Sequence, residues 1–341
     1  MDPHQLYLNQ LLDSKECSTE SLQLFLNDLL HHRIEQELAA AILIALRVRG
    51  ETGEELAAAA QLLRSMMHPL SRDERTVADT CGTGGDNSHT FNISTATAFV
   101  AAASGVRIAK HGNRAVSSTS GSSDVLSALG INVESGIRWA EKTLRDNGIA
   151  FCFAPHYHPS MAAVAGLRAK LKTRTIFNLL GPLLNPASAD YQILGVGRPE
   201  LANRLAKALW HSTIKRAFVL HSRDGLDEIS LAAPTDVIEV IPGYEIIHHV
   251  WNEGDFGLPA VPREAILVHS AIESATLITD ILHGKACPAR DVVLANSAAL
   301  LYLVGACKSL AEGTHLTLQS IQSGAAWEKV RALAASSSEK E

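Results

Sequence analysis

The sequence predicts an α/β protein, in which a small N-terminal helical domain precedes a larger domain with a mainly parallel central sheet. Two observations lead to this fold class. The first seventy residues show only helical periodicity, and after residue 75 short β-branched or apolar runs alternate with glycine-rich loops and alanine-rich helices. Strand, loop and helix repeated in this way are typical of a parallel sheet whose strands are joined by helical crossovers.

The helical prediction for residues 1–70 rests on the spacing of apolar side chains. Apolar residues recur at i, i+3, i+4 and i+7 over 22–29 and again over 38–45, which is the pattern of a helix with one buried face. Thr52 stands three residues before Glu55, immediately ahead of an alanine-rich run. This capping-box pattern predicts the start of a further helix.

Six short runs of β-branched and apolar residues are the expected strands of the α/β domain. They span residues 76–78, 106–109, 149–153, 192–196, 217–221 and 237–241. Ligands of open parallel sheets bind at the loops beyond the carboxyl ends of the strands. Functional residues are therefore expected in the loops that follow these runs.

The domain boundaries follow from an interruption in the strand pattern. Residues 161–184 form an apolar and basic stretch without strand signals. We expect this stretch to pack back onto residues 1–70 and to complete the helical domain. The α/β domain then comprises residues 75–160 and 190–335.

Composition and charge narrow the class of protein. Of the 341 residues, 46% are hydrophobic and 19% charged, which is the balance of an ordinary globular chain. The 30 basic and 36 acidic residues give a net charge of −6, which argues against a nucleic-acid partner. The five cysteines form no CxxC pair, as expected for a reduced, cytoplasmic protein.

No membrane partner is expected either. The N-terminus lacks the basic and apolar regions of a signal peptide. The most apolar stretch, 292–307, contains Asn296 and Ser297 and is too short and too polar to span a bilayer. It is expected to be a buried helix.

The loop at 79–86 carries the first functional signal. Gly82, Gly84 and Gly85 would allow positive φ angles and a close approach of backbone N–H groups to an anion. The pattern is neither a Rossmann fingerprint nor a P-loop. The alternative interpretation is a tight strand-to-helix turn.

A second anion-binding signal follows at 92–95. Ser94 and Thr95 place two hydroxyls at the expected start of a helix, where free N–H groups favour a phosphate. The alternative is that one of these two residues is only an N-cap.

A third anion-binding signal follows the strand expected at 106–109. Lys110, His111 and Arg114 precede a run of hydroxyl residues that ends at Asp124. Such a loop can surround a polyanionic ligand with charge-assisted hydrogen bonds. For Arg114 the alternative is a structural ion pair.

Adjacent carboxylates follow the strand predicted at 217–221. Asp227 and Glu228 lie in a loop, so both can face one hard cation. Magnesium commonly binds through one or two carboxylates together with substrate phosphates. The alternative is simple surface charge.

Taken together and in this order, these motifs resemble those of anthranilate phosphoribosyltransferases. The segments 157–159 and 174–186 share the resemblance, which covers nearly the whole chain. Pyrimidine nucleoside phosphorylases of the same fold have similar glycine-rich and Lys-His-Gly segments. Residues at two places depart from the family pattern: Thr119, where a basic residue is common, and Ser222-Arg223 before Asp224, where glycine or serine is more usual.

The resemblance implies a reaction and an architecture. The phosphoribosyl group of 5-phosphoribosyl 1-diphosphate would pass to the amine of anthranilate, a step of tryptophan biosynthesis. The helical domain would be hinged to the α/β domain in a nucleoside phosphorylase and phosphoribosyltransferase-like fold, usually as a homodimer. An aromatic amine is neutral at pH 7, so no residue is expected to act as a nucleophile or as a general acid or base.

The resemblance also implies three sets of ligand-binding residues. Phosphoribosyl diphosphate would be bound by Gly82, Gly85, Asp86, Thr90, Asn92, Ile93, Ser94, Thr95, Lys110, His111, Gly112, Asn113, Arg114, Ala115, Val116, Ser117, Ser118 and Ser122. Anthranilate would be bound by Asn113 and Arg168, with Gly82, His111, His158 and Pro182 as neighbours. Ser94, Asp227 and Glu228 would hold magnesium, two ions per subunit.

Two other functions stay open on the residues alone. A pyrimidine nucleoside phosphorylase-like enzyme would run the same sugar chemistry without needing the Asp227-Glu228 pair. A non-enzymatic nucleic-acid-binding member of the fold would need a basic face, which the net charge of −6 does not favour.

Overall fold

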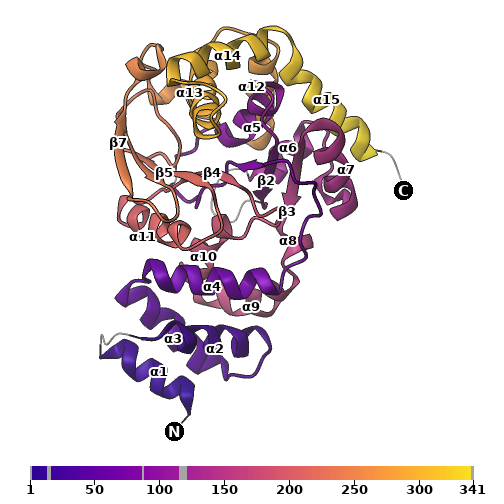
Figure 1. The fold of residues 1–341 in the computed structure, drawn as a ribbon. Coiled ribbons are helices and arrows are strands. Elements are labelled where there is room, and N and C mark those ends of the chain that lie inside the picture. Colours follow the sequence, from indigo (N-terminus) through magenta and orange to yellow (C-terminus); the bar gives the residue numbers. More distant parts are fainter. Residues whose placement is uncertain (1, 14–16, 87, 115–120, 339–341) are drawn as a thin grey trace.

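The computed structural model describes residues 2–13, 17–86, 88–114 and 121–338. Its N-terminal part is a helical bundle at one end of the molecule (Figure 1). The bundle helices are α1 (Pro3–Leu12), α2 (Thr19–Leu30), α3 (Gln36–Arg49) and α4 (Gly53–Ser65). The predicted capping box is confirmed, because Thr52 and Glu55 each accept a hydrogen bond from the other's backbone N–H.

Within the described residues, the central sheet has seven strands in the order β3-β2-β1-β4-β5-β6-β7. They are β1 (Ala78–Asp79), β2 (Ile108–Gly112), β3 (Ile149–Phe153), β4 (Tyr191–Gly195), β5 (Arg216–Ser222), β6 (Thr235–Val240) and β7 (Ile247–Trp251). The first five pair in parallel, and β6 and β7 add to the β5 edge in antiparallel fashion. The mainly parallel sheet is therefore confirmed.

The strand predictions differ from the structure in several bounds: the run expected at 106–109 becomes β2 at Ile108–Gly112, and three other strands differ by one or two residues at an end. The run expected at 76–78 becomes β1, which is only two residues long and shifted toward Asp79. β7 was not predicted, because its exposed face and its two histidines hide the alternation that marks a strand.

Helices cover both faces of the sheet. On one face lie α5 (Ile93–Ala103) and α13 (Pro288–Leu303), which contact β2, β3, β4 and β5; on the other, α11 (Pro199–Trp210) lies between the sheet and α4. Alternate residues of β5 serve the two cores: Phe218 packs with the first layer and Val219 with the second. α13 is buried along most of its length, which confirms the buried helix predicted at 292–307, although it begins at Pro288 and ends at Leu303.

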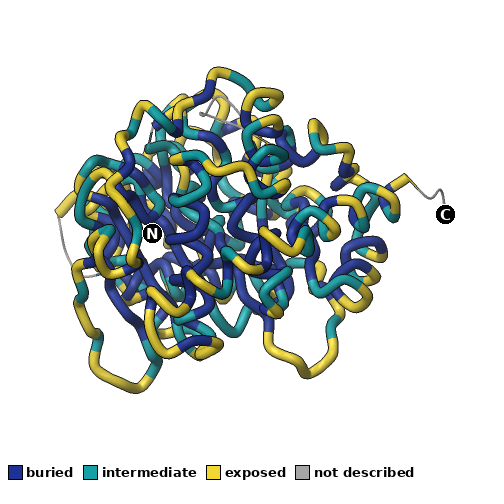
Figure 2. Tube along the Cα trace, turned by 90° about the horizontal axis from the view of Figure 1, so that it is seen from above, coloured by how far each residue is buried: buried dark blue, intermediate teal, exposed yellow. Residues whose placement is uncertain are grey.

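The remaining helices lie around these layers. They are α6 (Ser122–Ala128), α7 (Ile137–Asn147), α8 (Ala154–Tyr157), α9 (Ala162–Leu171), α10 (Ile176–Leu180), α12 (Ala271–Leu282), α14 (Leu310–Gln322) and α15 (Ala325–Ser338). Short 3-10 helices are η1 (Val133–Ser135), η2 (Pro159–Met161), η3 (Gly181–Leu183), η4 (Glu253–Phe256) and η5 (Arg263–Ile266). Viewed from above, buried segments occupy the middle of the molecule and exposed loops its margin (Figure 2).

The chain passes between the bundle and the sheet three times, and backbone hydrogen bonds join these crossings. After α4, the N–H of His68 donates to the carbonyl of Tyr157 at 2.8 Å, and that of Leu70 to Pro186 at 3.0 Å. The three connections are therefore held side by side at one junction.

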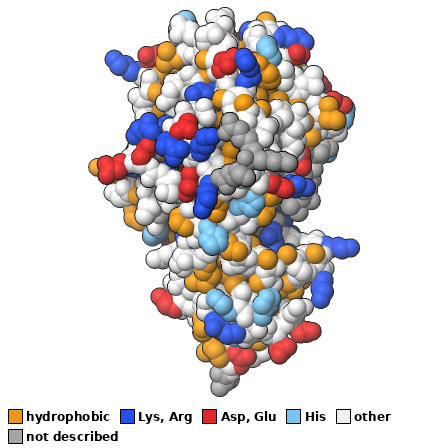
Figure 3. Space-filling model, turned by 90° about the vertical axis from the view of Figure 1, so that its right-hand side faces the viewer, with side chains coloured by type: hydrophobic (Ala, Val, Ile, Leu, Met, Phe, Trp, Pro, Cys, Tyr) orange, Lys and Arg blue, Asp and Glu red, His pale blue; other side chains and the backbone are white. Residues whose placement is uncertain are grey.

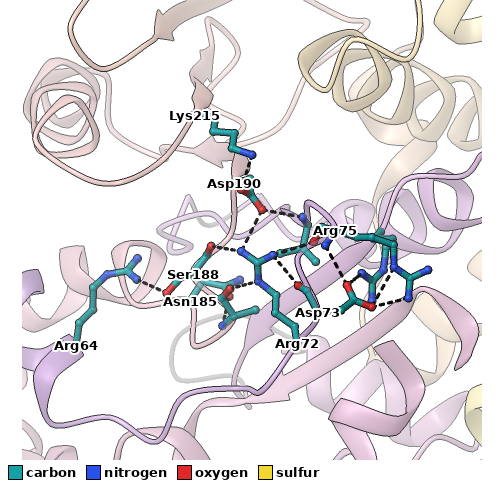
Figure 4. Close-up of polar contacts among 11 residues, drawn as sticks. Arg64, Arg72, Asp73, Arg75, Asn185, Ser188, Asp190 and Lys215 are labelled. Atoms are coloured by element: carbon teal, nitrogen blue, oxygen red, sulfur yellow. Dashed lines mark hydrogen bonds and ion pairs between the residues drawn. The ribbon is translucent and has the colours of Figure 1, made fainter. Parts of the chain in front are cut away.

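Arg72 strengthens this junction (Figure 4). Its guanidinium donates to the carbonyl of Ala187 at 2.8 Å and pairs with Asp190 at 3.1 Å. Asp190 also pairs with Lys215 at 3.1 Å and accepts the N–H of Val77 at 3.0 Å. The start of β1 and the start of β4 are thus fixed to one carboxylate, which sets the loops beyond their other ends.

In the part of the chain that the structure describes, no helix is long and apolar enough to cross a membrane. The five cysteines, all of them among the described residues, form no disulfide.

Candidate active site

The predicted loops meet beyond the carboxyl ends of β1, β2, β4 and β5. The Lys110 ammonium, at the end of β2, donates to the carbonyl of Thr80 at 2.7 Å and to the Ser94 hydroxyl at 3.0 Å. The N–H of Gly84 donates to the Asp227 carboxylate at 3.1 Å. The glycine loop, the start of α5, the end of β2 and the acidic loop therefore form one site.

The glycine loop takes a conformation that favours glycine. Gly84 and Gly85 have φ angles of +62° and +70°. The N–H of Thr83 donates to the carbonyl of Gly195 at 2.8 Å, which holds the loop against β4. At Gly195 itself a Cβ would lie 1.6 Å from the carbonyl oxygen of Asp227, so the close approach of the two loops requires glycine.

The start of α5 differs from the alternative considered above. The N-cap is Asn92, whose side chain accepts the N–H of Thr95 at 3.2 Å, so neither Ser94 nor Thr95 is the cap. The Ser94 hydroxyl is consequently available to Lys110, and the Ser94 backbone N–H lowers the pKa of the Glu228 carboxyl group.

Three carboxylates crowd the far side of the loop. The N–H of Asp227 lies 3.5 Å from a carboxylate oxygen of Asp86. Burial, reinforced by Asp86, raises the pKa of Asp227, and burial together with Asp227 raises the pKa of Glu228. Lys110 offsets this repulsion only in part.

This donor set fits a hard cation that brings further oxygen ligands with it. Among the residues described, no three His, Cys, Asp or Glu side chains form a preformed metal cluster. Magnesium needs few protein ligands, because it retains waters and binds substrate phosphates. Asp227 and Glu228 beside Ser94 supply oxygen donors of the right kind.

A buried pair of histidines lies next to Lys110. The Nε2 atoms of His111 and His158 are 3.2 Å apart, and Nδ1 of His111 lies 3.1 Å from the carbonyl of Gly181. Burial lowers the pKa of His111 to about 3 and that of His158 to about 4. Both imidazoles are therefore neutral at pH 7.

Arg168 lies on α9, on the helical side of the site. Its guanidinium is 5.9 Å from the ring centre of Phe177, and it makes no hydrogen bond or ion pair with another described residue. Burial lowers its pKa. A half-buried arginine without an acidic partner is suited to bind a carboxylate from outside the chain. Pro182, in η3, is buried, and its carbonyl accepts from Gln192 at 2.7 Å.

The remaining predicted residues are spread along the rim. Asn113 and Arg114 are exposed. Arg114 pairs with Glu134, as expected if its role is that of a structural ion pair. Thr90 shares a hydrogen bond of 3.1 Å with Ser88. Ala115, Val116, Ser117, Ser118 and Thr119 lie outside the described residues.

Gly112 and Ser122 bracket this undescribed stretch. A Cβ on Gly112 would lie 2.4 Å from the Ser122 hydroxyl, so the two ends of the loop are close. In Figure 3, basic side chains gather with acidic ones on the upper lobe, and histidine side chains lie at the narrowing between the two lobes and on the lower lobe.

The sequence did not reveal that Asp79 and Asn185 hold the residues of the site in place. Asp79 is buried, accepts from the N–H of His111 at 3.2 Å and from the amide of Asn185 at 2.7 Å, and has its pKa raised to about 6 by burial. Asp79 and Asn185 lie within motifs identified in the sequence, but they are more than a hundred positions apart. A contact of that range leaves no local signal in the sequence.

Comparison with known proteins agrees with this geometry. Two family models match: a glycosyl transferase family helical bundle domain over residues 5–67 and the a/b domain of the same family over residues 74–327. The chain is 41% identical to an anthranilate phosphoribosyltransferase of Chromobacterium violaceum, with 97% of each chain covered. It is 44% identical to one from Anaeromyxobacter dehalogenans, covering 97% of this chain and 98% of the relative.

Solved structures give the same result. An anthranilate phosphoribosyltransferase from Thermus thermophilus has a TM-score of 0.90 at 36% identity, with 98% of this chain and 99% of that one covered. The Saccharomyces cerevisiae enzyme in complex with PRPP and Mg has a TM-score of 0.89 at 29% identity, with 98% of both chains covered.

Proposed function

The chain belongs to the anthranilate phosphoribosyltransferase family, and we propose that it transfers the phosphoribosyl group of phosphoribosyl diphosphate to the amine of anthranilate. The observation that carries the proposal is the contact of Lys110 with Ser94 and Thr80, beside the carboxylates of Asp227 and Glu228. It joins an anion-binding helix start, a fixed cation and metal-binding oxygens at one point. The products would be phosphoribosylanthranilate and diphosphate, in tryptophan biosynthesis.

The loops around this point would bind phosphoribosyl diphosphate. The left-handed backbone at Gly84 and Gly85 brings the peptide groups of the loop close to a ligand, and the start of α5 offers N–H groups to a phosphate. Lys110 adds a buried positive charge. The full binding set proposed is the one that the family resemblance implies, from Gly82 to Ser122.

Ser94, Asp227 and Glu228 would hold magnesium, with two ions per subunit as our proposal. When bound, the metal would stabilise the negative charge of the departing diphosphate. The chain itself would supply the oxygen donors. Their carboxylates repel one another, as the raised pKa of Glu228 indicates, and a bound cation would relieve this repulsion.

Anthranilate would enter from the side of Arg168 and Asn113. The planar guanidinium of Arg168 matches a carboxylate in two-point contact. His111 and His158 stay neutral, so they would line the aromatic ring without repelling the approaching sugar cation. Gly82 and Pro182 complete this wall.

The chemistry then needs alignment more than proton transfer. Departure of diphosphate leaves an oxocarbenium-like sugar, and the neutral amine attacks the carbon that the diphosphate has left. The nitrogen, now positively charged, then loses one proton to water or to the diphosphate. Dipoles and charges of the folded protein would stabilise the charge that develops in the transition state. Binding both substrates in line would remove most of the entropic cost of bringing them together. No nucleophile or general acid or base is required of the protein.

We assign residues 1–70, completed by 161–184, to a helical domain, and 75–160 with 190–335 to the phosphoribosyl diphosphate-binding domain. The packing of α9 against α2 and α3, and of α10 against α3 and α4, supports the assignment. A homodimer in the cytoplasm is part of the same proposal.

Product analysis tests the proposal against phosphorolysis. Purified protein is incubated with anthranilate, phosphoribosyl diphosphate and magnesium, and separately with a pyrimidine nucleoside and phosphate. Mass spectrometry should find phosphoribosylanthranilate in the first mixture and no free base in the second. Free base in the second mixture, without product in the first, would favour the phosphorylase.

A further inference from the structure

Arg174 reaches the glycine loop from the helical side of the molecule. It lies in the short link between α9 and α10. Its Nη2 donates to the carbonyl of Gly85 at 2.9 Å and lies 3.3 Å from that of Gly84. One guanidinium therefore holds two successive carbonyls of the loop assigned to the diphosphate.

The two glycines differ in what this contact demands of them. A Cβ on Gly85 would lie 1.7 Å from Nη2 of Arg174, whereas a Cβ on Gly84 would meet nothing within 4 Å. A side chain at position 85 would therefore have to displace the Arg174 guanidinium, and it would also meet the strain of the positive φ.

Arg174 is itself held from the bundle. Arg47, on α3, donates to the carbonyl of Arg174 at 2.8 Å and to the hydroxyl of Thr173. A chain of hydrogen bonds therefore runs from α3 through the 173–174 backbone to the glycine loop.

Charged groups of both signs act on Arg174. Asp227 and Asp86 attract its guanidinium, whereas Arg198 and Arg47 repel it. The carbonyl oxygens of Gly84 and Gly85 therefore already have a cationic hydrogen-bond partner.

We propose that Arg174 is a positioning residue, which fixes the glycine loop in the conformation that accepts the diphosphate and ties that conformation to the helical bundle. The proposal rests on the proposed function for the identity of the ligand. The contact itself can be tested without any ligand.

The experiment compares Arg174→Met and Arg174→Lys with Arg198→Met as the matched control. Arg198 lies close enough to act on the charge of Arg174, but its ion pair, at 3.8 Å, is with Glu200. Hydrogen exchange of the peptide covering residues 83–86 is measured in the ligand-free full chain. Calorimetry with phosphoribosyl diphosphate and magnesium, and saturation curves for both substrates, follow.

Arg174→Met should speed exchange in this peptide and weaken phosphoribosyl diphosphate binding about tenfold, with the KM for anthranilate unchanged. Arg174→Lys, which keeps one donor, should recover part of the affinity. Arg198→Met should behave as wild type.

Unchanged exchange, faster exchange with unchanged affinity, or an equal loss in Arg198→Met would each overturn the proposal. If Arg174→Met does not fold, Arg174→Lys and Arg47→Met decide, since both must also loosen the loop and weaken binding. Failure of the wild-type chain to bind phosphoribosyl diphosphate would instead contradict the proposed function, while the exchange result would still report on the contact.

Discussion

The ammonium nitrogen of Lys110 lies 3.0 Å from the hydroxyl oxygen of Ser94, so the end of β2 is tied to the first turn of α5. The two elements that carry the expected phosphate-binding groups are thereby held in one arrangement before a ligand arrives. Such preorganisation lowers the cost of binding.

Lys110→Met should therefore weaken phosphoribosyl diphosphate binding. The substitution keeps the buried stem but removes a charge-assisted donor, whose loss costs about 1.5–3 kcal/mol, or about tenfold or more in affinity. Calorimetry measures the change. Lys285→Met, at an exposed pair with Asp280, is the control and should bind normally. Equal affinity in the two variants would count against the role of Lys110.

Asp227→Asn combined with Glu228→Gln should abolish most turnover at saturating phosphoribosyl diphosphate. The fold should stay intact, because neutral amides relieve the repulsion among Asp86, Asp227 and Glu228. Turnover and the melting temperature are measured side by side. Asp236→Asn, which removes a surface pair with Arg223, is the control. Wild-type turnover in the double variant would exclude these carboxylates as metal ligands.

Gly84→Ala and Gly85→Ala should differ in severity. At Gly84 the space is open, so the cost is backbone strain of about 1 kcal/mol from its φ of +62°. At Gly85 the added methyl also displaces Arg174. Phosphoribosyl diphosphate affinity, measured by calorimetry, should fall modestly in the first and severely in the second. The reverse order would contradict this account of the loop.

Arg168→Ala should raise the KM for anthranilate, or lower kcat if the contact also aligns the amine. The lost charge-assisted contact is worth about 1.5–3 kcal/mol. Phosphoribosyl diphosphate affinity should hardly change, because its loops lie on the sheet side. Lys170→Ala, on the same helix, is the control. A loss confined to the phosphoribosyl diphosphate curve would place Arg168 at the other substrate.

The contribution of the two buried histidines to protein stability should fall as the pH drops below about 6.5. His111 and His158 have folded-state pKa values lowered by burial to about 3 and about 4, so below that pH the unfolded chain binds protons that the folded chain does not. Each imidazole can contribute at most about 2 kcal/mol between about pH 6.5 and pH 5.

Urea unfolding at about pH 7.5 and about pH 5 checks this for the wild type and for His158→Gln, which should lose less stability on acidification. Asp79, Asp227 and Glu228 work in the opposite direction, because burial raises the pKa of each carboxyl group. The difference between the two proteins therefore isolates the histidine. His248→Gln, at an exposed position, should match the wild type, and equal slopes in all three would contradict the assignment.

Most of the fold could be predicted because the helices and strands follow from the spacing and composition of residues that are close in the sequence. The strand at 149–153 was predicted to the residue, and the Thr52 capping box and the buried helix over 292–307 follow from spacing and composition. β7 could not be found, because an exposed edge strand needs no apolar alternation.

The loops of the site could be identified because parallel strands end at one edge of a sheet. The residues that hold these loops in place could not be identified. Asp79 meets Asn185, and Arg174 meets Gly85, only because the chain crosses between bundle and sheet several times. Contacts of that range have no periodicity, and the N-cap at Asn92 was hidden among hydroxyl neighbours that cap helices equally well.

The most direct test of the enzyme assignment is the fluorescence of anthranilate, followed as the purified chain converts it to phosphoribosylanthranilate with phosphoribosyl diphosphate. The account predicts conversion that needs both substrates and stops when a chelator removes magnesium, then resumes when the metal is restored. No conversion by the folded protein, or conversion undiminished in chelator, would contradict it.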